Sequence, residues 1–136
     1  MTQLLNSPHL DIVEQAVWCL GNVCNEDITL RDLCIDAGVV QVLSKMLMTP
    51  NLSRSSLKNF SWALTNLCRN KPMAPFEKIK DGLPVLLNIF LQHDDDDIIK
   101  DVIWSLAYFS DISNDVGHLV ASSGILPKLI TYLKHK

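Results

Sequence analysis

The segment Glu14-Gln-Ala-Val-Trp-Cys-Leu-Gly-Asn22 recurs twice along this chain of 136 residues, as Lys58-Asn-Phe-Ser-Trp-Ala-Leu-Thr-Asn66 and as Lys100-Asp-Val-Ile-Trp-Ser-Leu-Ala-Tyr108. The tryptophans of the three segments stand 44 and 42 residues apart. This interval is typical of helical repeats that stack into a solenoid, in which each repeat packs only against its neighbours. The recurrence therefore predicts an all-α solenoid in which equivalent side chains form rows along the stack.

Glycine recurs in a second register of the same repeat, at Gly38, Gly82 and Gly124, and an amphipathic run follows each one. Because glycine readily ends a helix in the left-handed conformation, we expect each of the three to separate a short helix from a middle helix. The short helices are expected at about 28–36, 76–80 and 115–122, and the middle helices at 39–48, 83–92 and 125–134. One repeat is thus a short helix, a middle helix and a long helix that carries the tryptophan.

The repeat register divides the chain into two whole repeats, 27–70 and 71–112, between partial repeats at 1–26 and 113–136. In this register the chain begins within a middle helix, over 2–6, and stops at the end of another. We therefore expect a segment of a longer solenoid, with apolar surface exposed at both ends because neighbouring repeats would cover it. Self-association through these ends is a possible consequence.

The overall composition excludes several classes of partner. The 15 acidic residues outnumber the 12 lysines and arginines, which gives a formal charge of −3, and no basic cluster suits a phosphate backbone. No apolar run approaches the roughly 20 residues that span a bilayer. We therefore expect neither nucleic acid nor a membrane as a partner, and a cationic partner fits the charge better.

The residue types that serve metals and catalysis are poorly placed for either purpose. The four cysteines, Cys19, Cys24, Cys34 and Cys68, show no CxxC spacing, so buried reduced thiols are expected. The aspartate run 94–97 is interpreted as a turn that caps the following helix rather than as a metal site. The four histidines lie apart, without a nucleophile or a ligand pair. No enzyme activity, catalytic residue, metal or cofactor is predicted.

The tryptophan-bearing helices have two distinct faces. The positions three before each tryptophan, the tryptophan itself and four after it fall within an arc of about 60°. They are Gln15, Trp18 and Asn22, then Asn59, Trp62 and Asn66, then Asp101, Trp104 and Tyr108. The mostly apolar arc, with Leu20, Leu64 and Leu106, points more than a right angle away. A tryptophan alone is more often a core residue, but buried amides would each need a partner, so we favour an exposed face.

An exposed face of this composition suits a basic peptide. Neighbouring indoles form slots for the aliphatic stem and cationic head of lysine or arginine, and amides can bind the main chain of an extended peptide. Carboxylates that could complete the slots are Glu26, Asp27, Asp101 and Asp111. Helices about 8–10 Å apart correspond to about three residues of extended chain, so a motif of about five to eight residues is expected.

These residues resemble the importin-α family, armadillo-repeat adaptors that recognise nuclear localisation signals. The resemblance covers the whole chain and corresponds to about the third to fifth armadillo repeats. Its most specific pieces are 14–22 with Arg31-Asp-Leu33, 62–71, and 104–108 with Asp111. The resemblance implies a right-handed superhelical solenoid with three helices per repeat. It also implies a nuclear import adaptor, found in cytoplasm and nucleus, that binds signal peptides of cargo proteins.

The resemblance further implies roles for single residues. The tryptophans stack along lysine stems, Asn22 and Asn66 bind the peptide main chain in a concave groove, and Glu26 stands at the acidic position of the main lysine pocket. With Asp101 included, the predicted peptide-binding residues are Gln15, Trp18, Asn22, Glu26, Asn59, Trp62, Asn66, Asp101, Trp104 and Tyr108. Importin-β would bind only through a basic N-terminal segment that is missing from this chain.

Two expectations concern the basic residues of the groove. Arg69, seven residues after Trp62, would repel a basic peptide, and we favour an ion pair with Asp101 over direct ligand contact. An alternative function is an armadillo scaffold that binds acidic or apolar partners. That function would require a basic groove. Among the ladder positions, which are the repeated positions on the tryptophan face of the long helices, we expect no cation other than Arg69.

Overall fold

The computed structural model describes residues 4–69 and 72–134 of the chain. Its elements are η1 (Leu4–Asn6), α1 (Leu10–Glu26), α2 (Ile28–Asp36), α3 (Val39–Leu47), α4 (Arg54–Cys68), α5 (Phe76–Ile79), α6 (Gly82–Gln92), α7 (Asp96–Ser110), α8 (Asn114–Ser122) and α9 (Leu126–Lys134). Within these ranges every regular element is helical. The short, middle and long order predicted for one repeat is present in α2 to α4 and again in α5 to α7.

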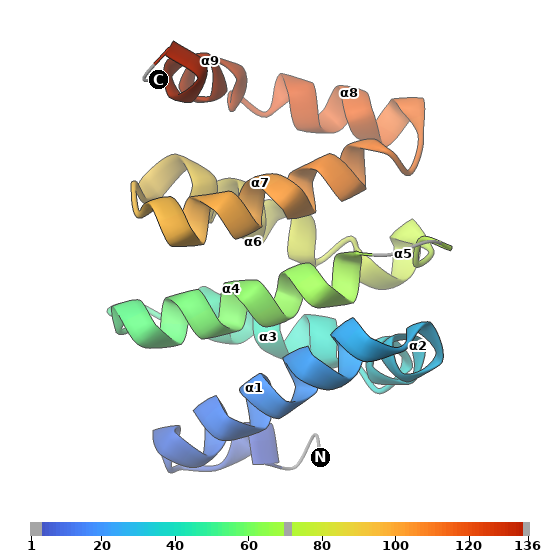
Figure 1. Cartoon of the computed structure of the whole chain (residues 1–136), viewed down its shortest axis with the longest axis vertical. Helices are drawn as coiled ribbons and strands as arrows, with labels where there is room; N and C mark the ends of the chain where they lie inside the picture. Colours follow the sequence, from blue (N-terminus) through green and yellow to red (C-terminus); the bar gives the residue numbers. More distant parts are fainter. Residues whose placement is uncertain (1–3, 70–71, 135–136) are drawn as a thin grey trace.

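The elements form an elongated stack rather than a rounded bundle (Figure 1). The long helices α1, α4 and α7 lie one above the other, with direct contacts between α1 and α4 and between α4 and α7. The middle helices α3 and α6 form a second row behind them, and the two ends of the chain lie at opposite ends of the stack. This arrangement confirms the predicted solenoid.

One apolar core runs along the whole stack. It is continuous from Leu5 in η1 to Ile125 just before α9. The predicted apolar arc of the long helices points into it, since Leu20, Leu64 and Leu106 are all buried. No helix within the described ranges has the length and apolarity needed to cross a membrane.

Helix caps explain where several elements begin. The carboxylate of Asp27 accepts hydrogen bonds from the backbone N–H groups of Thr29 and Leu30, at 2.7 and 3.1 Å, and so starts α2. Asp95 caps α7 in the same way, through the N–H groups of Asp97 and Ile98. The interpretation of the aspartate run as a capping turn is therefore confirmed.

The recurring glycines do not all serve the same purpose. Gly38 and Gly124 have φ values of 79° and 88°, the left-handed conformation that was predicted. The prediction is wrong for Gly82, which is the first residue of α6. A Cβ at this position would stand 3.3 Å from Leu64 Cδ1, so close packing of α6 against α4 explains the glycine instead.

The buried side chain of Arg31 connects α2 with Arg69 and Pro72, two residues that follow α4. Arg31 is 1% exposed, and its guanidinium donates hydrogen bonds to the carbonyl oxygens of Arg69 and Pro72 at 2.7 and 2.9 Å. It also pairs with the neighbouring Asp32 at 2.7 Å. The carbonyl group of Arg69, the C-cap residue of α4, thereby gains a donor from α2.

The two ends of the stack expose apolar side chains, as predicted. Leu4, Leu10 and Ile12 are exposed at one end, and Ile130 and Leu133 at the other. The middle helix expected over 2–6 is a 3-10 turn at Leu4–Asn6, and residues 2 and 3 lie outside the described part of the chain.

The four thiols are free, but they are not all buried. Cys24 and Cys68 are buried and Cys34 is partly buried, whereas Cys19 is exposed. The prediction of a buried thiol is therefore wrong for Cys19. This residue directly follows Trp18 and lines an apolar cavity with Leu4 and Ile12 at the end of the stack, where no further helix of the described chain covers it.

Candidate functional site

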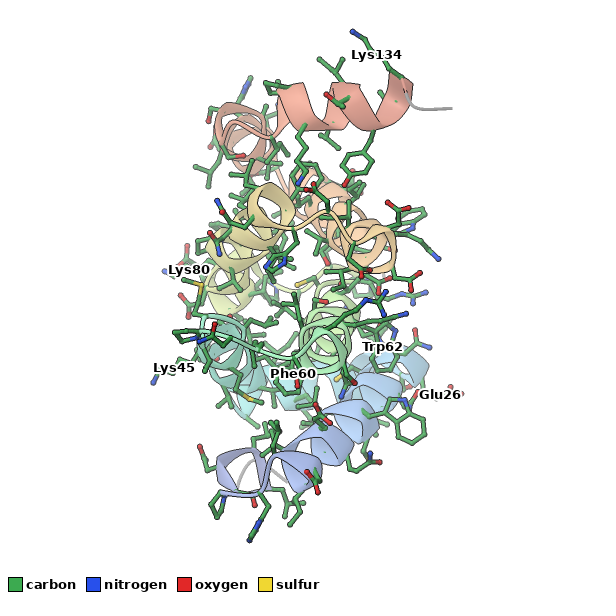
Figure 2. The ribbon with its side chains drawn as sticks, turned by 90° about the vertical axis from the view of Figure 1, so that its left-hand side faces the viewer. Glu26, Lys45, Phe60, Trp62, Lys80 and Lys134 are labelled. Atoms are coloured by element: carbon green, nitrogen blue, oxygen red, sulfur yellow. The ribbon has the colours of Figure 1, made fainter. Side chains whose placement is uncertain are left out.

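The three tryptophans border two adjoining cavities on the row of long helices. The first cavity, of about 640 Å³, lies between Trp18 of α1 and Trp62 of α4. The second, of about 260 Å³, lies between Trp62 and Trp104 of α7. In Figure 2, Trp62 and Glu26 lie on one side of the stack, while Lys45 and Lys80 project from the opposite side. We call the two cavities together the groove.

The indoles of the groove differ in exposure. Trp18 and Trp104 are 56% and 55% exposed, whereas Trp62 is only partly exposed. Trp104 stacks on Tyr108 with ring centroids 6.1 Å apart and ring planes 26° apart. The expectation of an exposed face is confirmed for the outer two tryptophans and holds in part for Trp62.

The side-chain amides of Asn59 and Asn66 in α4 form hydrogen bonds to α1 that the sequence alone did not predict. Asn66 is 1% exposed, and its Nδ2 donates a hydrogen bond to the carbonyl oxygen of Gly21 at 3.0 Å. Asn59, two turns earlier, donates to the carbonyl oxygen of Glu14 at 2.9 Å. The expectation of an exposed Asn66 is therefore wrong, because the backbone of α1 supplies the partner that a buried amide needs. Asn22, at the equivalent position of α1, is exposed.

Asp101 is the carboxylate that the two cavities share. It lines both of them and forms no ion pair with any residue in the described ranges. Partial burial raises the pKa of its carboxyl, and the nearby Lys100 and Lys58 oppose that rise. A cation bound in either cavity could form the ion pair that Asp101 does not form with any described residue.

The other predicted carboxylates lie outside both cavities. Glu26 is exposed at the last turn of α1, and Asp27 is committed to capping α2. Backbone hydrogen bonds from Leu30 and Thr29 lower the pKa of Asp27. Asp111 lines a separate cavity beside α5 with Phe76. Gln15 is exposed and lines the apolar cavity at the α1 end of the stack rather than the groove.

Arg69 lies in the second cavity but does not pair with Asp101. No ion pair joins the two side chains, and Arg69 Nε is buried without an acceptor among the residues described. Arg69 follows the last residue of α4 and has an extended backbone, with φ −87° and ψ 172°. The predicted pair assumed that the helical register of α4 continues to Arg69, and it does not.

Sequence reasoning missed two cations in the first cavity. Lys58 and Arg54 line it, one and two turns before Trp62 on the same side of α4. The expectation of no cation other than Arg69 concerns the repeated ladder positions, and these two residues lie in the groove outside those positions. Lys58 pairs with Asp97 at 2.6 Å and Arg54 with Asp95 at 2.5 Å. Hydrogen bonds from these cations lower the pKa of both aspartates. The sequence signal for these two cations is their spacing, four and eight residues before Trp62, which places them on the tryptophan side of α4.

The groove holds no arrangement typical of a metal centre. Within residues 4–69 and 72–134, no three His, Cys, Asp or Glu side chains are grouped so that they could bind a metal ion. Its polar groups are instead an isolated carboxylate, cations and amides, between indole walls. Such a lining suits the recognition of another polypeptide.

Comparison with known sequences places the chain among armadillo-repeat proteins. The model of the Armadillo/beta-catenin-like repeat matches residues 2–25. Importin subunit alpha-2 of Arabidopsis thaliana is 37% identical over 135 residues, which cover 98% of this chain and 25% of the relative. Importin subunit alpha-3 of the same organism is 41% identical over 133 residues, again covering 98% of this chain and 25% of the relative. The chain thus spans about a quarter of the length of these curated relatives.

Solved structures show the same fold. The designed armadillo repeat protein YIII(Dq)4CqI matches with a TM-score of 0.81 at 23% identity, over 97% of this chain and 55% of that one. A second designed protein, YIII(Dq.V1)4CPAF in complex with the peptide (KR)4, matches with a TM-score of 0.78 at 22% identity, over 98% of this chain and 55% of that one. The solenoid is therefore an armadillo-repeat solenoid.

Proposed function

Because the chain belongs to the importin-α family, we propose that it binds Lys- and Arg-rich nuclear localisation signal peptides of cargo proteins, as part of a nuclear import adaptor. The observation that carries the proposal is the groove itself. Two adjoining cavities lie between three indoles and share one carboxylate, Asp101, which has no ion-pair partner in the described chain. The proposed setting is the cytoplasm and the nucleus, which follows from the family.

The groove offers two kinds of interaction to a cationic side chain. The indoles of Trp18 and Trp62 border the first cavity, so they can contact the aliphatic stem of a lysine and attract its ammonium group. Asp101 can accept a charge-assisted hydrogen bond from the head. The second cavity repeats this arrangement with Trp62, Trp104 and the same carboxylate.

The cations already in the first cavity do not close it to a basic ligand. Asp97 and Asp95 pair with Lys58 and Arg54, so these two positive charges are locally balanced. Arg54 and Lys58 are substantially exposed, so solvent screens both pairs and each contributes little to stability. The side chains can therefore move aside for a ligand at small cost.

The main-chain contacts of the proposed complex are fewer than sequence alone suggests. Asn59 and Asn66 each commit one N–H to α1, whereas Asn22 is exposed. The proposed peptide-binding residues divide into two groups. Those that line the groove are Trp18, Asn59, Trp62, Asn66, Asp101, Trp104 and Tyr108, with Asn66 almost fully buried. Gln15, Asn22 and Glu26 lie outside both cavities and are proposed only for a peptide that extends beyond them. Each cation–π slot contributes about 1–2 kcal/mol, and micromolar affinity needs about 8 kcal/mol. This stretch of groove is therefore expected to bind weakly.

The direct test is a titration with (KR)4, the peptide bound by the designed protein of similar fold. A fluorescein-labelled (KR)4 peptide should bind, and its affinity should fall as salt is added, because the attraction is electrostatic. An acidic peptide of equal length, (ED)4, serves as the matched control. Tighter binding of (ED)4 than of (KR)4 would contradict the proposal.

The second candidate function is recognition of an acidic partner by an armadillo scaffold. Arg69 favours it, since this cation lies in the second cavity and its Nε is buried without an acceptor in the described chain. The (ED)4 titration tests this candidate directly. Neither nucleic acid nor a membrane is proposed as a partner, and no catalytic role is proposed. Any contact with importin-β is assigned to regions outside this sequence.

A further inference from the structure

A glycine within α1 lies directly beneath the indole that separates the two cavities. Gly21 stands in the interior of α1 and has no positive φ, so the backbone alone does not require glycine there. A Cβ at this position would come within 2.2 Å of Trp62 Cζ3 and 2.8 Å of Trp62 Cη2. These distances are far below van der Waals contact, so the ring occupies the space of the missing side chain.

The next step of the stack shows what happens when that position carries a side chain. Thr65 of α4, three residues after Trp62, is the repeat equivalent of Gly21, three residues after Trp18. Its hydroxyl accepts a hydrogen bond from Ser105 at 2.7 Å and lies 3.2 Å from the carbonyl oxygen of Asp101. The surface of α4 at this point is therefore occupied by contacts to the backbone and side chains of α7.

The indoles of Trp62 and Trp104 differ in exposure. Trp62, above a glycine, is partly buried. Trp104, above the threonine, is 55% exposed, nearly as much as Trp18 at 56%, although Trp18 has no long helix of the described chain beneath it. Trp104 stacks on Tyr108 of its own helix instead. The less exposed ring is thus the one whose neighbouring helix carries glycine three positions after its tryptophan, although Trp62 also lies on the central long helix, between α1 and α7.

We propose that Gly21 is a positioning residue of the groove, which holds the Trp62 indole against α1 and so sets the affinity for a cationic side chain. The affinity part rests on the proposed function. Trp62 and Asp101 are the residues common to both cavities. The indole is rigid, so a side chain at position 21 would turn the whole ring away from α1 and into the cavities that it borders.

The placement of the indole is tested without any peptide. In a Trp18→Phe, Trp104→Phe background, Trp62 is the only tryptophan, and iodide quenching of its fluorescence reports its accessibility. Adding Gly21→Ala should raise the quenching constant. The reciprocal change, Thr65→Gly in a Trp18→Phe, Trp62→Phe background, should lower the quenching of Trp104, because that ring gains room on α4. An unchanged quenching constant for Trp62 in a folded Gly21→Ala variant overturns the proposal.

The effect on affinity is tested with all three tryptophans in place. Gly21→Ala should weaken (KR)4 binding about 5- to 30-fold, the share of one cation–π slot. Gly82→Ala is the matched control, since its Cβ would also meet a close neighbour, Leu64, but lies outside the groove. The affinity of the Gly82→Ala variant for (KR)4 should equal that of the unchanged chain.

The possible results separate the two proposals. Increased quenching with unaltered (KR)4 affinity refutes Gly21 as a positioning residue for binding. If Gly21→Ala raises the quenching of Trp62 but the unchanged chain does not bind (KR)4 at all, the proposed function is refuted. The conclusion that Gly21 positions the Trp62 indole then still holds. If Gly21→Ala does not fold, the Thr65→Gly variant decides, and unchanged or increased quenching of Trp104 then overturns the proposal.

Discussion

Replacement of Asn66 by alanine should destabilise the fold, although sequence reasoning alone assigns this residue to the ligand. The side chain is 1% exposed and donates one hydrogen bond, at 3.0 Å, to the carbonyl oxygen of Gly21. A buried hydrogen bond contributes about 1 kcal/mol net, and the emptied space adds a further fraction, so we expect a loss of about 1–2 kcal/mol. For a domain of this size, about 1–2 kcal/mol corresponds to a fall in Tm of a few degrees.

The chain contains a matched control for this substitution. Asn22 also lies four residues after a tryptophan, but it is exposed and its side chain forms no hydrogen bond with residues 4–69 or 72–134. Asn22→Ala should therefore change the free energy of unfolding by less than about 0.5 kcal/mol. Urea denaturation followed by circular dichroism measures both variants. Equal losses in the two variants, or no loss in Asn66→Ala, would refute the account of Asn66 as a tie between α4 and α1.

Three further predictions follow from individual side chains. Asp101→Asn should weaken (KR)4 binding about tenfold and yet stabilise the fold near neutral pH, as isothermal titration and urea denaturation would show. The sign follows from its raised pKa: the folded protein binds this proton more tightly than the unfolded chain, so the contribution of Asp101 to stability is present at low pH and is lost as pH rises through that pKa. Arg31→Met should cost about 2–4 kcal/mol in urea denaturation, because two backbone carbonyls lose a buried donor, whereas the exposed Arg54→Met should leave the urea midpoint almost unchanged. Iodoacetamide at pH 8 should modify Cys19 more than about tenfold faster than Cys68, whose pKa is raised to about 12 by burial, and peptide mass mapping with time would expose any contrary order.

The repeat and its elements could be predicted from the sequence because their signals are local. The bounds of α2 follow from the capping carboxylate of Asp27 and from Gly38, both of which act within a few residues. The apolar arc of each long helix is likewise a property of one helix, and Leu20, Leu64 and Leu106 point inward as expected. Such features do not depend on how neighbouring helices meet.

The details of the groove could not be predicted because they depend on pairs of helices. The arc that Asn66 shares with Trp62 is correct for α4 alone, but α1 covers that part of the arc and accepts the amide hydrogen bond. The predicted pair of Arg69 with Asp101 requires α4 to continue to Arg69, but the helix ends at Cys68. The repeat register predicts a left-handed conformation for Gly82, whereas the close approach of Leu64 explains the glycine.

The amide ties between α4 and α1 also act as a fixed spacer. Asn59 and Asn66 bind carbonyl oxygens two turns apart on α1, so α4 can neither slide nor rotate on α1 without breaking both hydrogen bonds. Between α7 and α4 the equivalent amides are absent, and the hydroxyls of Thr65 and Ser105 form the polar contact instead. The spacing between α1 and α4 is therefore fixed more firmly than the spacing between α4 and α7. A ligand that spans all three long helices would be accommodated by a change in the second spacing.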